Sequence, residues 1–220
     1  TVAEQRQFFD EIILGYSQCF WMEGCAAPTV GDHLISFRCK QGAKPVARQP
    51  IPLSPYDNLR VEYHLEENVA QGKLRKIKVG EEPLPEWATP VFIVDQDAKG
   101  LLGRMVCAYG PVNSCLEIST FPSADPQMAF DVAAFKSHHT VIDAIWGYTQ
   151  FLLDEETKKM LVICARSGLY EWLRMPFGPA PAPAMVQSYV HRRFGTLRDE
   201  KTGRPFCSPL MDDIKISSET

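Results

Sequence analysis

The segment Leu210-Met211-Asp212-Asp213, taken together with Asp143 far upstream, constrains this chain more than any other feature. Asp212 and Asp213 lie in a short stretch, 210–217, that is typical of a tight strand–turn–strand. Asp143 follows the apolar residues 140–142, which we expect to form a strand. Three carboxylates at the ends of two neighbouring strands could hold two hard divalent cations. Two such ions can clamp the attacking and leaving oxygens of an in-line phosphoryl transfer.

An Asp-Asp pair taken alone is more simply a solvated turn. The distant Asp143 and the motifs between the two sites decide whether the metal-site interpretation holds.

Composition sets broad limits. The chain has 220 residues and a formal net charge of −4, which is enough for one core or two closely associated subdomains. An acidic total is unusual for a nucleic-acid binder, although positive charge gathers locally at 73–78 and 191–193. No apolar run reaches the roughly 20 residues that cross a bilayer, so we expect no membrane partner.

The cysteines and the first residue suggest where the chain works. None of the seven cysteines forms a C-x-x-C pair or lies at zinc-ligand spacing from a histidine. We expect reduced, mostly buried thiols and a cytoplasmic or nuclear location. Because the chain begins at Thr1 and no signal segment follows, we expect a fragment, a processed product or a trimmed chain.

Apolar spacing predicts four helices. They cover 3–17, from Ser54-Pro55 to Gly72, from about Asp125-Pro126 to Lys136, and 183–194. The residues expected to face inward are Phe8, Ile12 and Tyr16; Val61, Leu65 and Val69; and Met128, Val132 and Phe135. Ser54 followed by Pro55 is typical of a helix start.

Strands are predicted at 33–37, 90–95, 104–109 and 140–142, with a turn at 97–100. Residues 148–153 and 160–164 flank a charged segment and suggest a hairpin, and a second hairpin carries Asp212 and Asp213. This mixture of helices and strands favours an α+β fold.

Several motifs occur in the order of a known family. They are Lys44 to Pro50; Trp87-Ala88-Thr89-Pro90-Val91; Arg104-Met105 with 109–113; 121–143; Asp143 through Gly147-Tyr148-Thr149-Gln150; 168–172; Met175-Pro176-Phe177-Gly178; Ala182-Pro183-Ala184 with Gln187; and Leu210 to Asp213. With them, the chain resembles the reverse transcriptase domain of Gypsy-type LTR retrotransposons and retroviruses.

The resemblance covers 44–220 and leaves 1–43 as an N-terminal leader or linker with one helix. It implies the fingers and palm of a right-hand polymerase, with a partly antiparallel palm sheet, and a chain that stops before the thumb. The implied activity is RNA-directed DNA polymerisation on an RNA template with a DNA primer and deoxynucleotides. A downstream thumb, a ribonuclease H domain or a second chain is an expected partner.

The resemblance also implies residue roles. Asp143, Asp212 and Asp213 would hold two Mg²⁺ ions, with Mn²⁺ as an alternative. Arg104 and Lys99 would contact the incoming triphosphate. The remaining implied site residues are Tyr148 as a gate against a ribose 2′-hydroxyl, Phe177 and Gly178 in the nucleotide pocket, and Met211 and Gln187 at the template and primer.

The sequence also departs from the family. Ala108-Tyr109-Gly110 replaces an Asp-aromatic-Arg triplet, and 95–99 replaces a basic fingers turn with one that carries two aspartates. Leu210 stands where the signature has Tyr, and Lys215 where an apolar residue is usual. Pro209 precedes Leu210, where a central strand should donate a backbone hydrogen bond.

These departures keep two alternatives open. The domain could be a decayed or repurposed reverse transcriptase fold that acts as a binding or scaffold subunit, or a nucleic-acid binder without catalysis. Simpler interpretations also exist for single residues: Tyr148 as a core aromatic, Arg104 as an exposed strand residue, and His138-His139 as structural. The run 73–78 is more simply a solvated face, with contact to a phosphate backbone as the alternative. Arg192-Arg193 are more simply charges that complement a helix dipole, with contact to the template backbone as the alternative.

Overall fold

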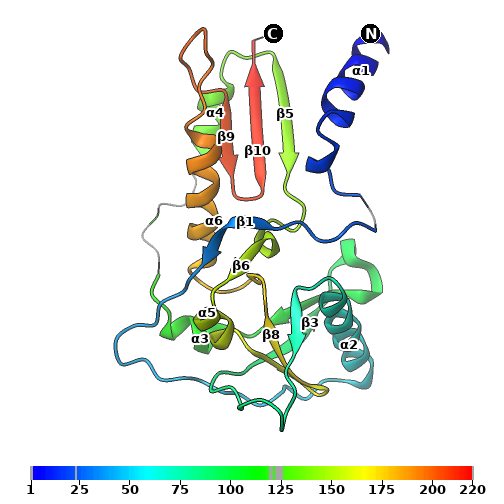
Figure 1. Cartoon of the computed structure of the whole chain (residues 1–220), viewed down its shortest axis with the longest axis vertical. Coiled ribbons are helices and arrows are strands. Elements are labelled where there is room, and N and C mark those ends of the chain that lie inside the picture. The colour runs from blue at the N-terminus through cyan, green and yellow to red at the C-terminus, as the bar shows by residue number, and fades with distance from the viewer. Residues whose placement is uncertain (1, 23, 119–120, 122–125, 220) are drawn as a thin grey trace.

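The structure is a computed structural model that describes residues 2–22, 24–118, 121 and 126–219; the side chains of 97–99, 126 and 128 lie outside the description. Three strands stand at one end of the molecule beside the helix α6 (Ala182–Val190), and a mixed sheet with the helix α2 (Pro55–Ala70) forms the other end (Figure 1). This arrangement of separate helices and sheets confirms the predicted α+β class.

The first sheet is antiparallel and has the order β5 (His138–Asp143), β10 (Asp213–Ser218), β9 (Cys207–Leu210). Its register places Asp213 opposite Asp143 and Ile214 opposite Ile142. The β9–β10 turn therefore ends beside the last residue of β5, as the sequence predicted.

Pro209 lies in β9, which is an edge strand in the order β5-β10-β9. The expectation that Pro209 conflicts with a central strand is therefore wrong. An edge position tolerates proline because one side of such a strand has no neighbour to which it must donate.

The second sheet is mixed and has the order β2 (Leu74–Lys76), β8 (Gly168–Trp172), β7 (Ile163–Ala165), β3 (Thr89–Val94), β4 (Arg104–Cys107). Only the β3–β7 pair is parallel. The strands predicted at 90–95 and 104–109 are confirmed as β3 and β4, with slightly different ends. The basic segment 73–78 was not predicted to contain a strand, yet it supplies β2, and Lys73 is buried.

A short parallel pair joins the two ends of the molecule. The strand β1 (Val30–Ile35), predicted a few residues later, pairs with β6 (Phe151–Leu153). The carbonyl of Ile35 also accepts a hydrogen bond from the amide of Asp154.

The predicted hairpin at 148–164 is wrong. The charged segment forms the helix α5 (Glu155–Met160), whose first amides are capped by the Asp154 carboxylate at 2.8 Å from the Thr157 nitrogen. Glutamates in the first turn and lysines in the last complement the helix dipole, and they pair at i,i+3 spacing. A helix is therefore favoured over a turn between β6 and β7.

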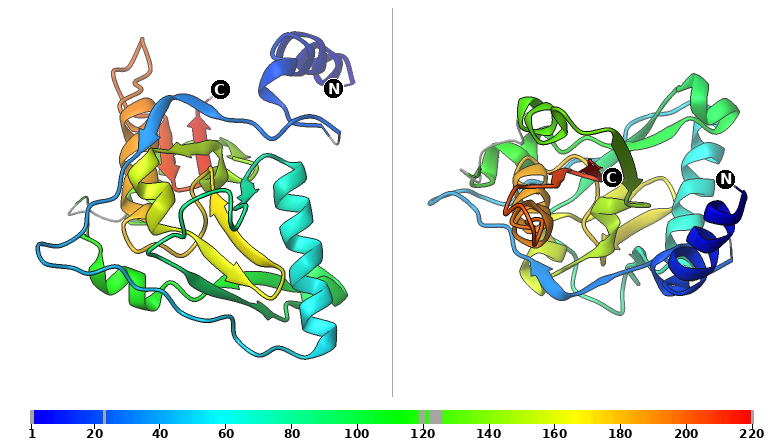
Figure 2. Two further views of the ribbon diagram at one scale, coloured as in Figure 1. Left: turned by 60° about the horizontal axis from the view of Figure 1, so that its bottom comes forward. Right: turned by 90° about the horizontal axis from the view of Figure 1, so that it is seen from above.

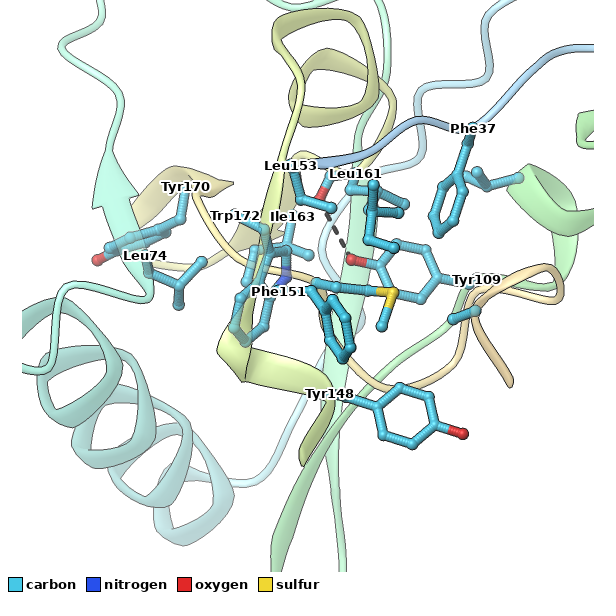
Figure 3. Close-up of a cluster of buried hydrophobic side chains, with 14 of the residues drawn as sticks. Phe37, Leu74, Tyr109, Tyr148, Phe151, Leu153, Leu161, Ile163, Tyr170 and Trp172 are labelled. Carbon is cyan, nitrogen blue, oxygen red and sulfur yellow. Dashed lines mark hydrogen bonds between the residues drawn. The ribbon is translucent and has the colours of Figure 1, made fainter. Parts of the chain in front are cut away.

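Aromatic and branched side chains from the second sheet and its surroundings form the core (Figure 3). Tyr109, Leu161 and Ile163 are almost fully buried, and the Tyr109 hydroxyl donates to the carbonyl of Leu161 at 3.2 Å. Trp172, Phe151 and Leu153 lie around them (Figure 3). This core fixes β7, β8 and β4 relative to one another.

The helix α2 is the best predicted element. The Ser54 hydroxyl accepts a hydrogen bond from the Asp57 amide, Pro55 is the first helical residue, and Val61 and Leu65 are buried. Val69 is exposed, so its predicted inward position is wrong. The short helix α3 (Gly110–Cys115) was not predicted.

The N-terminal helix forms as α1 (Val2–Phe8), the π-helical η1 (Phe9–Leu14) and the 3₁₀ turn η2 (Ser17–Cys19). Its apolar stripe is nevertheless exposed at Phe8, Ile12 and Tyr16, and both views of Figure 2 show α1 standing away from the sheets. The predicted inward orientation is therefore wrong for this helix.

The third predicted helix is α4 (Pro126–Ala133). It ends before Phe135, which has a φ of 63° and a fully exposed side chain, so its predicted burial is wrong. Met128 and the predicted start at Asp125 lie outside the description. The remaining short helices are η3 (Asp97–Leu102), η4 (Gly147–Gln150) and η5 (His191–Gly195), which extends α6 as predicted.

All seven cysteines are free, as expected for reduced thiols. Only Cys164 and Cys207 are buried, so the expectation of mostly buried thiols is wrong. Among the described residues, no helix has the length and apolar character that a bilayer-spanning segment needs.

Candidate functional site

A cleft of about 720 Å³ lies between the second sheet and the β9–β10 turn. Its lining includes Asp143, Asp212 and Trp146 from one side and Arg104, Lys73 and Phe177 from the other. The sequence motifs around 104, 143, 177 and 212 therefore meet in one place.

The three predicted metal-binding aspartates lie at one end of the first sheet. Asp143 ends β5, Asp213 begins β10 opposite it, and the Asp212 carbonyl accepts a hydrogen bond from the Ala144 amide at 2.8 Å. Asp143 and Asp212 line the cleft, whereas Asp213 is not among the residues that line it.

Asp212 is the electrostatically unusual member of this group. Its Oδ1 atom is buried and has no hydrogen-bond partner among the described residues. Burial raises the pKa of the Asp212 carboxyl, and the negative charges of Asp143 and Asp213 raise it further. A cation near these oxygens would relieve both effects.

These residues fit a divalent cation through two carboxylates. An orphaned, partly buried carboxylate oxygen beside a second carboxylate is a donor set that Mg²⁺ and Mn²⁺ accept. Within the described part of the chain, no three His, Cys, Asp or Glu side chains are grouped closely enough to hold a metal. Asp143 and Asp212 are thus the better supported ligands, and a ligand role of Asp213 stays a prediction.

The turn that presents Asp212 is held from α6. Met211 has a φ of 53°, a left-handed conformation that costs energy in a non-glycine residue. The Met211 amide donates to Gln187 Oε1 at 2.7 Å, and Gln187 Nε2 donates to the Pro209 carbonyl at 3.0 Å. Gln187 is buried, so the structure gives it the role of holding the turn. The contacts of Gln187 and Met211 with template or primer stay predictions.

Gly147 and Tyr148 lie directly beside the turn. A Cβ atom on Gly147 would be 2.5 Å from Asp212 Oδ1, so only glycine fits at this position with Asp212 where it is. The Tyr148 hydroxyl donates to the Met211 sulfur at 3.2 Å, and burial raises the pKa of Tyr148, followed by the charge of Asp212. Tyr148 is buried, and its gate function stays a prediction.

Arg104, Phe177 and Tyr148 form a line of contacts at the cleft, whose lining includes Arg104 and Phe177. The Arg104 guanidinium lies 4.7 Å from the Phe177 ring centroid, and the Phe177 and Tyr148 centroids are 4.6 Å apart. Gly178 has a φ of 111°, and its carbonyl accepts a hydrogen bond from Asn113. Asn113 belongs to the motif 109–113 but was not predicted as a site residue, and its hydrogen bonds to Gly178 and Ala180 fix the loop that carries Phe177.

Two further residues of the cleft were not singled out as site residues. Lys73 and Trp146 both line it, and the Lys73 ammonium lies 3.7 Å from the Trp146 ring centroid. A lysine inside a basic run and a tryptophan near Asp143 carry no local sign of such a contact.

One of the two aspartates in the segment 95–99 is paired with a cation. Asp95 forms an ion pair with Arg60 of α2, so its negative charge is compensated. The side chain of Lys99, predicted to contact a triphosphate, lies outside the described residues.

No protein-family model matches the chain. The enzymatic polyprotein of cauliflower mosaic virus (strain D/H) is 25% identical over 185 residues, which are 83% of this chain and 26% of the polyprotein. The retrovirus-related Pol polyprotein from transposon 297 of Drosophila melanogaster is 28% identical over 79% of this chain and 16% of its own length. The chain thus spans about a quarter, or less, of these relatives.

Solved structures give the fold. A foamy viral protease–reverse transcriptase in complex with double-stranded DNA covers 99% of this chain with a TM-score of 0.78 at 16% identity. The chain has a reverse transcriptase-like fold. The same viral protein in complex with an RNA/DNA hybrid matches with a TM-score of 0.76, and this chain covers 27% of it.

Within this reverse transcriptase-like fold, the first sheet is the palm and the second sheet belongs to the fingers. Two of the departures noted in the sequence can be placed in the structure: Gly110 begins α3, and the Lys215 ammonium lies 5.8 Å from the Phe130 ring centroid. Tyr109, the aromatic residue between Ala108 and Gly110, is part of the core.

Proposed function

We propose that this reverse transcriptase-like domain carries the nucleotidyl-transfer centre of an RNA-directed DNA polymerase from a retroelement of the Gypsy type. One observation carries the proposal: Asp143 and Asp212 face the same cleft as Arg104, and a buried carboxylate oxygen of Asp212 has no hydrogen-bond partner among the residues that the structure describes. Acids at one end and a guanidinium at the other suit a reaction that needs metal ions and a triphosphate.

Each residue has a distinct task in this proposal. Asp143 and Asp212 would hold Mg²⁺ or Mn²⁺, with Asp213 as a further carboxylate. When bound, such ions lower the pKa of an attacking hydroxyl and neutralise a leaving pyrophosphate. Arg104 binds the triphosphate through its guanidinium, and Lys99 is a second candidate for that contact.

The aromatic residues shape the sugar and base end of the site. Tyr148 lies against Phe177 and Met211, where its ring would select a deoxyribose over a ribose. Phe177 and Gly178 line the nucleotide pocket, and Met211 at the tip of the turn would contact primer or template. Gln187 supports that tip through its two hydrogen bonds.

The partners proposed are an RNA template, a DNA primer and deoxynucleotides. Structural neighbours solved with double-stranded DNA and with an RNA/DNA hybrid support this choice. Those neighbours and the polyprotein relatives are longer than this chain, so we propose that a thumb, a ribonuclease H domain or a second chain completes the grip on nucleic acid. A cytoplasmic or nuclear location is part of the proposal.

The test is the addition of one deoxynucleotide to a DNA primer on an RNA template, in Mg²⁺ or Mn²⁺. We expect addition by the parent and a loss of at least about a hundredfold in Asp143→Asn, because the substitution removes a metal ligand. Asp10→Asn, at an exposed N-terminal position, serves as the control and should match the parent. Equal rates for parent and Asp143→Asn would overturn the proposal.

A second candidate is a repurposed fold that binds partners without catalysis. It is favoured by the absence, among the described residues, of a grouped set of three metal-ligating side chains. Thermal stabilisation discriminates between the two, because a ligand that binds the folded state raises its stability by mass action. A rise of the melting temperature with Mg²⁺ that disappears in Asp212→Asn supports the enzyme; no rise in the parent supports the scaffold.

A further inference from the structure

Lys73 is a buried cation that faces the cleft without a carboxylate partner. Its side chain is 4% exposed and lines the cleft together with Asp143, Asp212 and Arg104. Among the described residues, no carboxylate oxygen lies within 4 Å of its ammonium group, which instead sits 3.7 Å from the Trp146 ring centroid. A cation–π contact compensates only part of the cost of burying a charge.

The surroundings confirm that this charge is held at a cost. Burial and, after it, the positive charge of Arg174 lower the pKa of Lys73, while Glu67 of α2 raises it, and together they bring this pKa to about 8. An anion that enters the cleft would therefore gain from pairing with an ammonium group that has no better partner.

Arg104, the second cation of the cleft, also lies against an aromatic ring. Its guanidinium lies over the Phe177 ring, and no carboxylate among the described residues is within ion-pair distance. Arg60 and Arg193 also lie over aromatic rings, but each of these two forms an ion pair with an aspartate as well. Both cations of the cleft are thus held on aromatic faces, which leaves their charges available to a ligand.

Trp172 lies in the same wall of the cleft. Its indole N–H faces the side chains of Cys107 and Tyr109 on the core side of the sheet. Trp172 is opposite Leu74 in the β2–β8 pair, so it is next to the strand that Lys73 precedes. Lys73 is therefore the group of this wall whose charge is left for a ligand, and an anion is the ligand that would pair with it.

We propose that Lys73 binds the polyphosphate group of a nucleotide in this cleft, as a second cation beside Arg104. Before the ligand binds, the Trp146 ring holds the ammonium group of Lys73. The identification of the ligand as a nucleotide rests on the proposed function. The contact itself rests on the unpaired cations and needs only a polyphosphate. It places a phosphate contact just before β2, in the basic run 73–78, for which the sequence favours a solvated face and leaves contact with phosphate as the alternative.

Binding of inorganic tripolyphosphate, measured by calorimetry at fixed ionic strength with EDTA present, tests the contact without metal or catalysis. Lys73→Met should weaken binding by about tenfold or more, because a charge-assisted contact is lost while the apolar stem is kept. Lys73→Arg should stay close to the parent, because it keeps the charge. Lys76→Met is the matched control: Lys76 is in the same basic run and also lies over a ring, that of Tyr170 at 5.6 Å, but does not line the cleft.

The outcomes separate this inference from the proposed function. Weak binding by Lys73→Met, with near-normal binding by Lys73→Arg and Lys76→Met, supports the inference even if the protein extends no primer. Unchanged binding by Lys73→Met overturns it, even if primer extension succeeds. Equal losses in Lys73→Met and Lys73→Arg, or no binding by the parent, also overturn it. A melting curve for each variant confirms that the protein being titrated is folded.

Discussion

Gly147 is the residue on which the position of Asp212 depends most directly. A Cβ atom at Gly147 would meet Asp212 Oδ1 at 2.5 Å and Cγ at 2.8 Å, which is far inside normal contact. The backbone of Gly147 is not left-handed, so the requirement for glycine comes from the carboxylate alone. Spacing in the sequence showed the glycine, but only the structure shows what it makes room for.

We therefore predict that Gly147→Ala displaces the Asp212 carboxylate and lowers the rate of nucleotide addition by about a hundredfold, the effect of a misplacement near 1 Å. Steady-state extension assays measure this rate. Gly110→Ala is the control, because a Cβ atom at Gly110 meets nothing within 4 Å. A Gly147→Ala variant with parental activity would show that Asp212 does not act from the position described.

The raised pKa of Asp212 predicts a pH-dependent stability. A carboxyl whose folded-state pKa lies above its unfolded value destabilises the fold at neutral pH, and this penalty disappears as pH falls below the unfolded pKa. Asp212→Asn should therefore raise the melting temperature at pH 7 in EDTA, and the gain should shrink towards pH 4.

Asp199 provides a control of opposite sign. Hydrogen bonds from the Thr202 backbone and side chain lower the pKa of Asp199. Asp199→Asn should thus lower the melting temperature at pH 7, and that loss should fade as the pH falls through the folded pKa. If both variants shift the melting temperature in the same direction, the claim that the ionised carboxylate of Asp212 destabilises the fold is wrong.

At the scale of elements, α6 positions the β9–β10 turn through one side chain. Gln187 accepts from the Met211 amide and donates to the Pro209 carbonyl, both across the interface between helix and turn. The family motif drew attention to Gln187 as a template contact, whereas the structure shows a buried support. Sequence reasoning could not separate these roles, because burial depends on the packing of α6 against β9.

We predict that Gln187→Leu costs about 2 kcal/mol or more of folding free energy, because it leaves two buried backbone groups unsatisfied. Urea denaturation measures this loss. Gln71→Leu should change stability by less than about 0.5 kcal/mol, since the side-chain bond of Gln71 is an exposed contact with Glu67. Equal stabilities for Gln187→Leu and the parent would show that α6 does not hold the β9–β10 turn through Gln187.

Local signals decided which elements could be predicted. The cap Ser54 and the proline after it fixed the start of α2, and the apolar stretch before Asp143 indicated β5, because these signals act within a few residues. The hairpin predicted around 154–159 failed, because a short charged segment fits both a turn and a capped helix. The parallel pairing of β1 with β6 has no local signal at all.

At the scale of the whole molecule, the order of motifs predicted the fold better than any single residue. Motifs around Arg104, Asp143, Phe177 and Asp212 converge on one cleft, because the palm and fingers sheets bring these segments together. The contact of Lys73 with Trp146 could not be predicted, since it joins residues from separate elements and depends on the left-handed backbone of Trp146. The net charge of −4 is compatible with binding an anionic ligand, because Lys73 and Arg104 place two positive side chains in the lining of the cleft.

The central claim is that the Asp143–Asp212 end of the cleft is a working nucleotidyl-transfer centre. The most direct measurement is primer extension on an RNA template with Mg²⁺ and with Mn²⁺, using the longest natural polypeptide that carries this chain. A double variant, Asp212→Asn with Asp213→Asn, and the control Asp199→Asn are assayed beside the parent. The account predicts extension by the parent and the control and none by the double variant. Folded parent protein that extends no primer with either metal, or a double variant as active as the parent, would contradict it.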